Sequence, residues 1–122
     1  MSLYPIDVLG TGAVLLGDAF VCDGFHKARI ARVQTHIHTD HMRDFETSKG
    51  LQDLFMSEET QQLLIAEFDA DLTMRGNLYA LPPGKRYAVN GCSVALFPNL
   101  HMLGSVQVLV ECEHGSLGYS GD

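Results

Sequence analysis

The sequence lacks the features that mark membrane proteins, secreted proteins and small disulfide scaffolds. No apolar run approaches the roughly 20 residues of a membrane-spanning helix, and the N-terminus has neither the basic nor the apolar block of a signal peptide. The three cysteines, Cys22, Cys92 and Cys112, form no CxxC pair. We therefore expect buried thiols, and neither a thiolate zinc site nor a disulfide framework. With only four prolines and no repeat, the 122 residues are predicted to form one cytoplasmic domain with no membrane partner.

Basic residues are also scarce. The chain has 8 Lys and Arg against 15 Asp and Glu, a net charge of −7. This balance argues against a free-standing nucleic-acid binder, because neutralising phosphates normally needs a basic face. Residues 57–71 contain five acids and no base, and we expect them to form a solvated acidic helix surface.

Short apolar runs and turn residues define the expected elements. The opening residues 6–25 are typical of a β-meander, and the single Gly-Thr-Gly within them is a hairpin turn, not a phosphate-binding loop. Further strands are expected over residues 29–38, 54–56, 78–81, 86–89, 93–97, 106–111 and 117–119, and helices over 40–49 and from the N-cap Ser57 to 68. Asn90-Gly91 predicts a type I′ hairpin turn. The order of elements predicts an α/β domain in which helices cover one face of a mixed sheet.

Four side chains that bind metals fall within six residues of the chain: His36, His38, Asp40 and His41. If His36 and His38 end a strand, their period of two places both imidazoles on one face. A loop after them would let Asp40 and His41 turn toward a second position, which suits a pair of zinc-like ions. The alternative is a polar edge strand whose histidines only face solvent.

The same residues resemble a known superfamily. The segment HIHTDH matches the HxHxDH signature of the metallo-β-lactamases, His101 in NLHMLGS resembles their third motif, and Asp122 in YSGD resembles the fourth. Asp23, at the end of an expected strand, resembles the aspartate found early in that fold. The resemblance implies that residues 1–122 are the N-terminal half of an αβ/βα sandwich, an apparently truncated domain.

The resemblance also implies roles for these residues. His36, His38 and His101 would bind a first Zn²⁺, Asp40 and His41 a second, and Asp122 would bridge the two ions; Mn²⁺ is the alternative metal. Asp40 and Asp122 are thus the expected catalytic residues, with a metal-bridging hydroxide as the nucleophile. We expect Asp23 to orient a histidine ring and not to bind a metal. His26 and His114 match no motif and are expected to be surface histidines.

Two further segments are similar to the β-CASP nucleases, which include ribonuclease J and the endonuclease of mRNA 3′-end processing. These segments are HMLGSVQV, residues 101–108, and FMSEET, residues 55–60. The similarity implies a zinc-dependent phosphodiesterase whose substrate is RNA or DNA. Two alternatives stay open: a small-molecule hydrolase of the same fold, cleaving a thioester, lactone or cyclic phosphodiester, and a metal-binding fragment without catalysis. Because the second half of the fold is absent, we expect a homo-oligomer or a need for that C-terminal half, and weak nuclease activity in this fragment alone.

Overall fold

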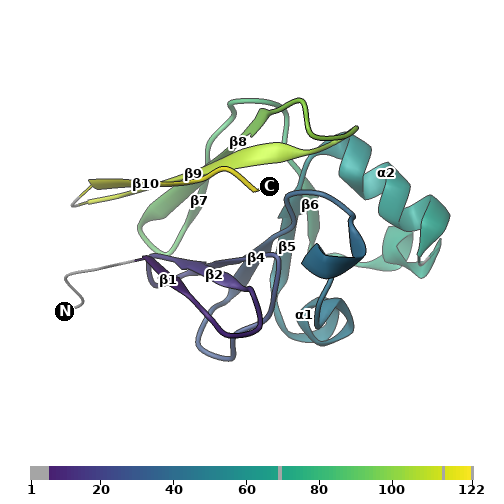
Figure 1. Cartoon of the computed structure of the whole chain (residues 1–122), viewed down its shortest axis with the longest axis horizontal. Helices are drawn as coiled ribbons and strands as arrows, with labels where there is room; N and C mark the ends of the chain where they lie inside the picture. The colour runs from purple at the N-terminus through teal and green to yellow at the C-terminus, as the bar shows by residue number, and fades with distance from the viewer. Residues whose placement is uncertain (1–5, 69, 114, 122) are drawn as a thin grey trace.

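The computed structural model describes residues 6–68, 70–113 and 115–121. These residues form short strands, two α-helices and two 3₁₀ turns (Figure 1). In chain order they are β1 (Ile6–Val8), β2 (Val14–Leu16), β3 (Phe20–Cys22), β4 (Ala31–Val33), η1 (Thr39–His41), α1 (Phe45–Leu51), β5 (Asp53–Met56), α2 (Glu58–Glu67), η2 (Ala70–Met74), β6 (Leu78–Ala80), β7 (Tyr87–Val89), β8 (Cys92–Pro98), β9 (Val106–Cys112) and β10 (Gly115–Tyr119).

The strands make two sheets. The first is a mixed six-stranded sheet in the order β1-β2-β3-β4-β5-β6, in which β1 to β3 are antiparallel and β3 to β6 are parallel. The second is a four-stranded antiparallel sheet in the order β10-β9-β8-β7. Asn90 (φ 49°) and Gly91 (φ 80°) connect β7 to β8 with the two positive φ angles of a type I′ turn. The hairpin predicted there is confirmed.

Two hydrophobic cores show how the layers pack. Side chains from both sheets share one core, among them Phe20, Val33 and Phe55 from the first sheet and Leu96 and Val108 from the second. The opposite face of the first sheet packs against the helices, through a second core formed by Phe45, Leu54, Met56, Leu64 and Leu72. Figure 1 shows α1 and α2 together beside β5 and β6. The predicted α/β class, with helices on one face of a mixed sheet, is confirmed.

The predicted strand over residues 29–38 is wrong in its length, because β4 ends at Val33. The Gln34 N–H still donates to the Phe55 carbonyl of β5 at 2.9 Å, but the next N–H, of Thr35, donates to the Asp23 carboxylate at 2.8 Å. The helix predicted from residue 40 is also wrong at its start: η1 forms first and α1 begins at Phe45. Asp44 has a left-handed conformation (φ 58°), which an α-helix cannot continue through.

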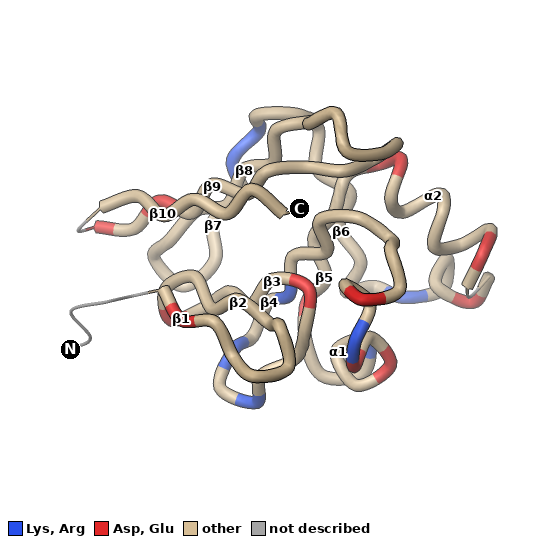
Figure 2. The backbone as a smooth tube through the Cα atoms, viewed as in Figure 1, with Lys and Arg blue, Asp and Glu red and all other residues tan. Residues whose placement is uncertain are grey.

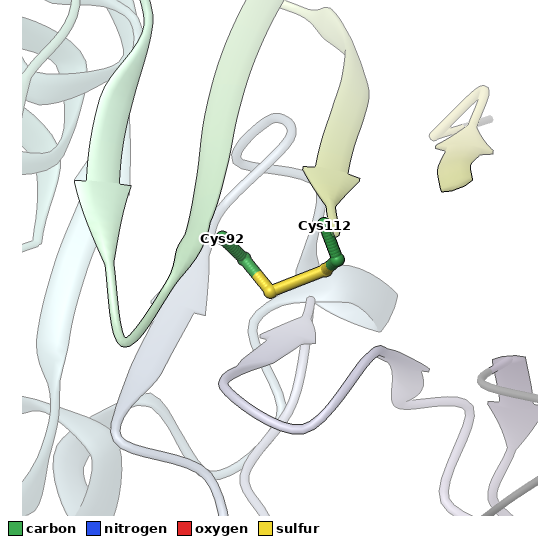
Figure 3. The surroundings of a disulfide bond; sticks show 2 residues. All are labelled: Cys92 and Cys112. Carbon is green, nitrogen blue, oxygen red and sulfur yellow. A yellow bond between two sulfur atoms is a disulfide. The ribbon is translucent and has the colours of Figure 1, made fainter. Parts of the chain in front are cut away.

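The expectation that all three cysteines are free thiols is wrong. Cys92 and Cys112 form a disulfide between β8 and β9, with their Cα atoms 4.3 Å apart (Figure 3). Only the pairing of the two strands brings these residues together, since they are 20 positions apart in sequence. Cys22 is a buried free thiol as expected, and burial raises its pKa well above the usual value.

Charged residues are distributed along the chain as its acidic composition suggests. Figure 2 shows lysine and arginine positions spread over separate segments of the backbone, with acidic positions at both ends of α2. Among the described residues, no helix is both long enough and apolar enough to cross a membrane.

Candidate metal centre

Two segments that are distant in sequence meet where β4 ends. The first is the turn of residues 34–41 after β4, and the second is the loop of residues 99–105 between β8 and β9. The Val106 N–H donates to the Thr35 carbonyl at 3.0 Å, which joins the bases of the two segments. The histidines of both segments therefore face a common space.

Three imidazoles converge in that space. His36, His38 and His101 each offer a nitrogen, and these atoms all lie within 4.8 Å of one another. The ring centroids are 4.7 to 4.9 Å apart, and His101 Nε2 lies 3.0 Å from His38 Nδ1. His36 is buried and His101 is exposed, so the group opens to solvent on one side. Three imidazoles with an open fourth side have the composition of a catalytic zinc site, and the residues therefore fit such an ion.

A second group adjoins the first and shares His36 with it. Candidate ligand atoms of Asp23, His36 and His41 also lie within 4.8 Å of one another. Asp23 Oδ2 is 2.8 Å from His41 Nδ1, which is the position of a carboxylate that orients an imidazole. The structure thus places Asp23 beside the His41 imidazole. That Asp23 orients a histidine ring and does not itself bind a metal stays a prediction.

Thr35 links the carboxylate to the buried imidazole. Its hydroxyl donates to Asp23 Oδ2 at 2.6 Å and lies 2.8 Å from His36 Nδ1. Since the hydroxyl proton is directed at the carboxylate, the proton between Thr35 and His36 belongs to Nδ1. This tautomer places the lone pair of His36 on Nε2. Burial, and then the neighbouring His41, lower the pKa of His36 below its ordinary value, which favours the neutral, metal-binding form.

Asp40 is not part of either group of ligand atoms among the described residues. Asp40 lies on the η1 turn, its side chain is 78% exposed, and its carboxylate lies 3.6 Å from His41 Nε2. Asp122 and His114 lie outside the described residues. The roles predicted for the two aspartates therefore stay predictions. His26 lies on the loop before β4, where its Nδ1 accepts a hydrogen bond from the Ala28 N–H at 3.1 Å.

No family model matches the sequence, and no curated protein matches it. Solved structures do match. A metallo-β-lactamase from Cronobacter sakazakii, a HARLDQ motif mutant, gives a TM-score of 0.72 at 14% identity, over 98% of this chain and 62% of that chain. MEM-A1, a subclass B3 metallo-β-lactamase from a soil metagenome library, gives 0.65 at 16% identity, over 94% of this chain and 57% of that one. Igni18, a metallo hydrolase from the archaeon Ignicoccus hospitalis, gives 0.62 at 17% identity, over 90% and 56%.

The chain has a metallo-β-lactamase fold. It spans a little more than half the length of the solved structures it matches. The predicted αβ/βα architecture is thus supported by solved structures of low sequence identity to this chain. The β-CASP nuclease subtype has no counterpart among them.

Sequence reasoning missed two buried polar residues that hold residues 36–41, the histidine loop of this metallo-β-lactamase fold. Gln34 is fully buried, and its side-chain amide donates to the carbonyls of His36 and His41, both at 2.7 Å. Its Oε1 accepts from Arg32 Nε at 3.0 Å. The sequence carries no signal for this burial, since polar residues that alternate with apolar ones, as in the run ARVQ, usually face solvent.

Arg32 is the fully buried partner of Gln34. Its guanidinium donates to the His41 carbonyl at 3.2 Å, to the Arg43 carbonyl at 2.9 Å and to Ser48 Oγ at 3.0 Å, and lies over the Phe45 ring. Burial lowers the pKa of Arg32 to about 10, which still leaves it charged at neutral pH. A buried cation that bonds backbone carbonyls ties the histidine loop to α1.

The His101 loop is held by the start of α2. Ser57 Oγ donates to the Gly104 carbonyl at 2.7 Å and accepts from the Thr60 N–H at 3.1 Å, while Thr60 Oγ1 also donates to Gly104 at 3.0 Å. The N-cap predicted at Ser57 is therefore confirmed. Gly104 has φ +84°, and a Cβ there would lie 2.6 Å from Thr60 Oγ1. Only glycine lets the loop approach α2 this closely.

Proposed function

We propose that this chain is the metal-binding part of a zinc-dependent phosphodiesterase of the metallo-β-lactamase superfamily that hydrolyses RNA or DNA. The observation that carries the proposal is the convergence of His36, His38 and His101 from two distant segments within a metallo-hydrolase fold. The choice of a nucleic acid rests on the similarity of residues 55–60 and 101–108 to β-CASP nucleases. The comparisons support the coarser statement, a metallo-hydrolase fold with histidine and aspartate groups suited to a divalent ion.

The residues of this chain would have the following roles in metal binding and catalysis. His36, His38 and His101 would hold a first ion, and His41 with Asp40 would contribute to a second. A bound divalent metal would lower the pKa of water and neutralise charge on a phosphate. Asp23 would keep His41 and Thr35 oriented, because its carboxylate contacts both side chains.

The second candidate is a small-molecule hydrolase. It is favoured by the solved structures described above, since two of those three are named metallo-β-lactamases. Both candidates use the same imidazoles, so the site alone does not distinguish them. The size and charge of the substrate do.

The deciding experiment is a substrate panel on the purified chain with zinc or manganese. We expect slow but measurable cleavage of single-stranded RNA or DNA oligonucleotides by this chain alone, with no turnover of a lactone, a thioester or a β-lactam. The matched control is the His36→Ala, His38→Ala double variant, which should lose both the activity and the tightly bound metal. Turnover of the small substrates alone would select the second candidate, and equal metal content in both proteins would refute the metal site itself.

Two accompanying proposals concern assembly and location. We propose that the protein is cytoplasmic and that it either self-associates or acts with a C-terminal half of the fold. Light scattering on the purified chain measures the first possibility directly. A monodisperse monomer with full nuclease activity would contradict both forms of the assembly proposal.

A further inference from the structure

The segments that carry the expected metal ligands meet at Thr35. This residue directly precedes His36 in the chain and is fully buried. Its carbonyl accepts the Val106 N–H at 3.0 Å, at the base of the loop between β8 and β9. Gly121, from the segment after β10, packs so closely against it that an added Cβ there would lie 3.3 Å from Thr35 Oγ1. The position of Thr35 therefore bears on all of these segments.

Both oxygens of the Asp23 carboxylate accept hydrogen bonds from Thr35. Oδ1 accepts from the Thr35 N–H at 2.8 Å, and Oδ2 accepts from the Thr35 hydroxyl at 2.6 Å. Oδ2 also lies 2.8 Å from His41 Nδ1. Because a carboxylate only accepts hydrogen bonds, Nδ1 is the protonated nitrogen of His41 and Nε2 carries the lone pair. One oxygen atom thus supports Thr35 and His41 together.

The Thr35 hydroxyl extends this constraint to His36. The hydroxyl has one proton, which it donates to Asp23, so Oγ1 can only accept at its 2.8 Å contact with His36 Nδ1. His36 is common to both groups of candidate ligand atoms, and His41 belongs to the second. The Asp23 carboxylate therefore orients one imidazole directly and another through a single hydroxyl.

We propose that Thr35 is a positioning residue, which extends the support of the Asp23 carboxylate from His41 to His36 and so presents Nε2 of both imidazoles to metal. The opposite tautomer of His36 would carry its proton on Nε2 and could not bind a metal through that nitrogen. The inference rests on the metal site of the proposed function, and it holds for a nucleic acid and for a small substrate alike. Thr35 acts through His36 and is not itself a ligand.

Thr35→Val tests the hydroxyl, because valine keeps the branched shape of threonine and removes the Oγ1 acceptor. In the metal-free variant His36 should populate both neutral tautomers, whereas His41 should keep its proton on Nδ1 through its direct contact with Asp23. NMR chemical shifts of the ring nitrogens measure this, since protonated and unprotonated nitrogens have different shifts. Zinc affinity of the same variant, from competition with a chelator, should fall by about 10-fold or more.

Asp23→Asn should reverse the direction of these hydrogen bonds. The Thr35 N–H keeps the oxygen of the new amide at the place of Oδ1, so the amide N–H takes the place of Oδ2 and donates to Thr35 Oγ1. The Thr35 hydroxyl then donates to His36 Nδ1, and the proton of His36 moves to Nε2. Both His36 and His41 should change tautomer in this variant, whereas only His36 changes in Thr35→Val.

Thr35→Ser and Thr60→Val are the controls. Serine restores the hydroxyl, so Thr35→Ser should return the proton of His36 to Nδ1 and recover most of the zinc affinity. Thr60→Val removes another fully buried threonine hydroxyl, which donates to the Gly104 carbonyl. It should lower the melting temperature, as Thr35→Val does, but leave the tautomer of His36 unchanged. The pair of valine variants therefore separates positioning from a general loss of stability.

The tautomer is measured without metal, so the outcomes separate this inference from the proposed function. A wild-type His36 with its proton on Nε2, or a Thr35→Ser variant no better than Thr35→Val, would overturn the inference. If the wild type binds no zinc but the tautomer of His36 depends on Thr35, the positioning role stands and the proposed metal site fails. If zinc binds and Thr35→Val changes neither tautomer nor affinity, the metal site stands and the role of Thr35 is refuted.

Discussion

Gln34→Met should separate the folding of this protein from its ability to bind metal. Methionine keeps the length and shape of glutamine but removes its amide. The substitution deletes three hydrogen bonds: those from Gln34 Nε2 to the carbonyls of His36 and His41, and the one from Arg32 to Gln34 Oε1. At about 1 kcal/mol for each bond, the free energy of unfolding should fall by about 3 kcal/mol.

The effect on metal affinity should be larger than a uniform loss of stability would produce. The His36 carbonyl loses its bond from Gln34, whereas the His41 carbonyl keeps a 3.2 Å bond from Arg32. The histidine loop would then be less fixed, and residues that support metal ligands typically contribute 10- to 100-fold in affinity. We therefore expect zinc affinity to fall by about 10-fold or more.

Two measurements check this prediction. Urea unfolding of the metal-free chain gives the change in stability, and competition with a chelator gives the zinc affinity. Ser48→Ala is the control, because it removes a bond to Arg32 that does not reach the histidine carbonyls. It should lower stability by about 1 kcal/mol and leave zinc affinity unchanged. If Gln34→Met loses stability but binds zinc as tightly as the wild type, the proposed role of Gln34 in positioning the ligands is wrong.

Three further predictions concern the loop on α2, the disulfide and Asp23. Gly104→Ala should lower the melting temperature more than Gly91→Ala. Both glycines have positive φ, but only at position 104 would the added Cβ meet α2. Equal losses of melting temperature would show that the close approach of Gly104 to α2 does not matter. Reduction of the Cys92–Cys112 disulfide should lower the free energy of unfolding by about 3 kcal/mol, because the disulfide closes a loop of 20 residues. A variant with serine at both positions should show no such change, and one whose stability still fell on adding reductant would contradict this. Asp23→Asn should weaken zinc binding by about 10-fold, and unchanged binding in a calorimetric titration would remove Asp23 from the centre.

Local patterns in the sequence determined much of this molecule. The Asn90-Gly91 turn, the N-cap at Ser57 and the alternation of strands with helices each depend on residues near one another in the chain. The spacing of His36 and His38 likewise indicated a shared site, although the strand assumed to present them ends at Val33. Such features are predictable because turn geometry, capping and periodicity are decided by neighbours within a few positions.

Tertiary structure decided the rest. His101 meets His38 across 63 positions of sequence, and Cys92 meets Cys112 only through the register of β8 and β9. Arg32 and Gln34 were ordinary polar residues in the sequence, and only the packing of α1 and the histidine loop over β4 buries them and fixes their partners. These contacts were not predictable from the sequence, because they depend on how sheets, loops and helices dock, and the energy of docking is shared among residues far apart in the chain.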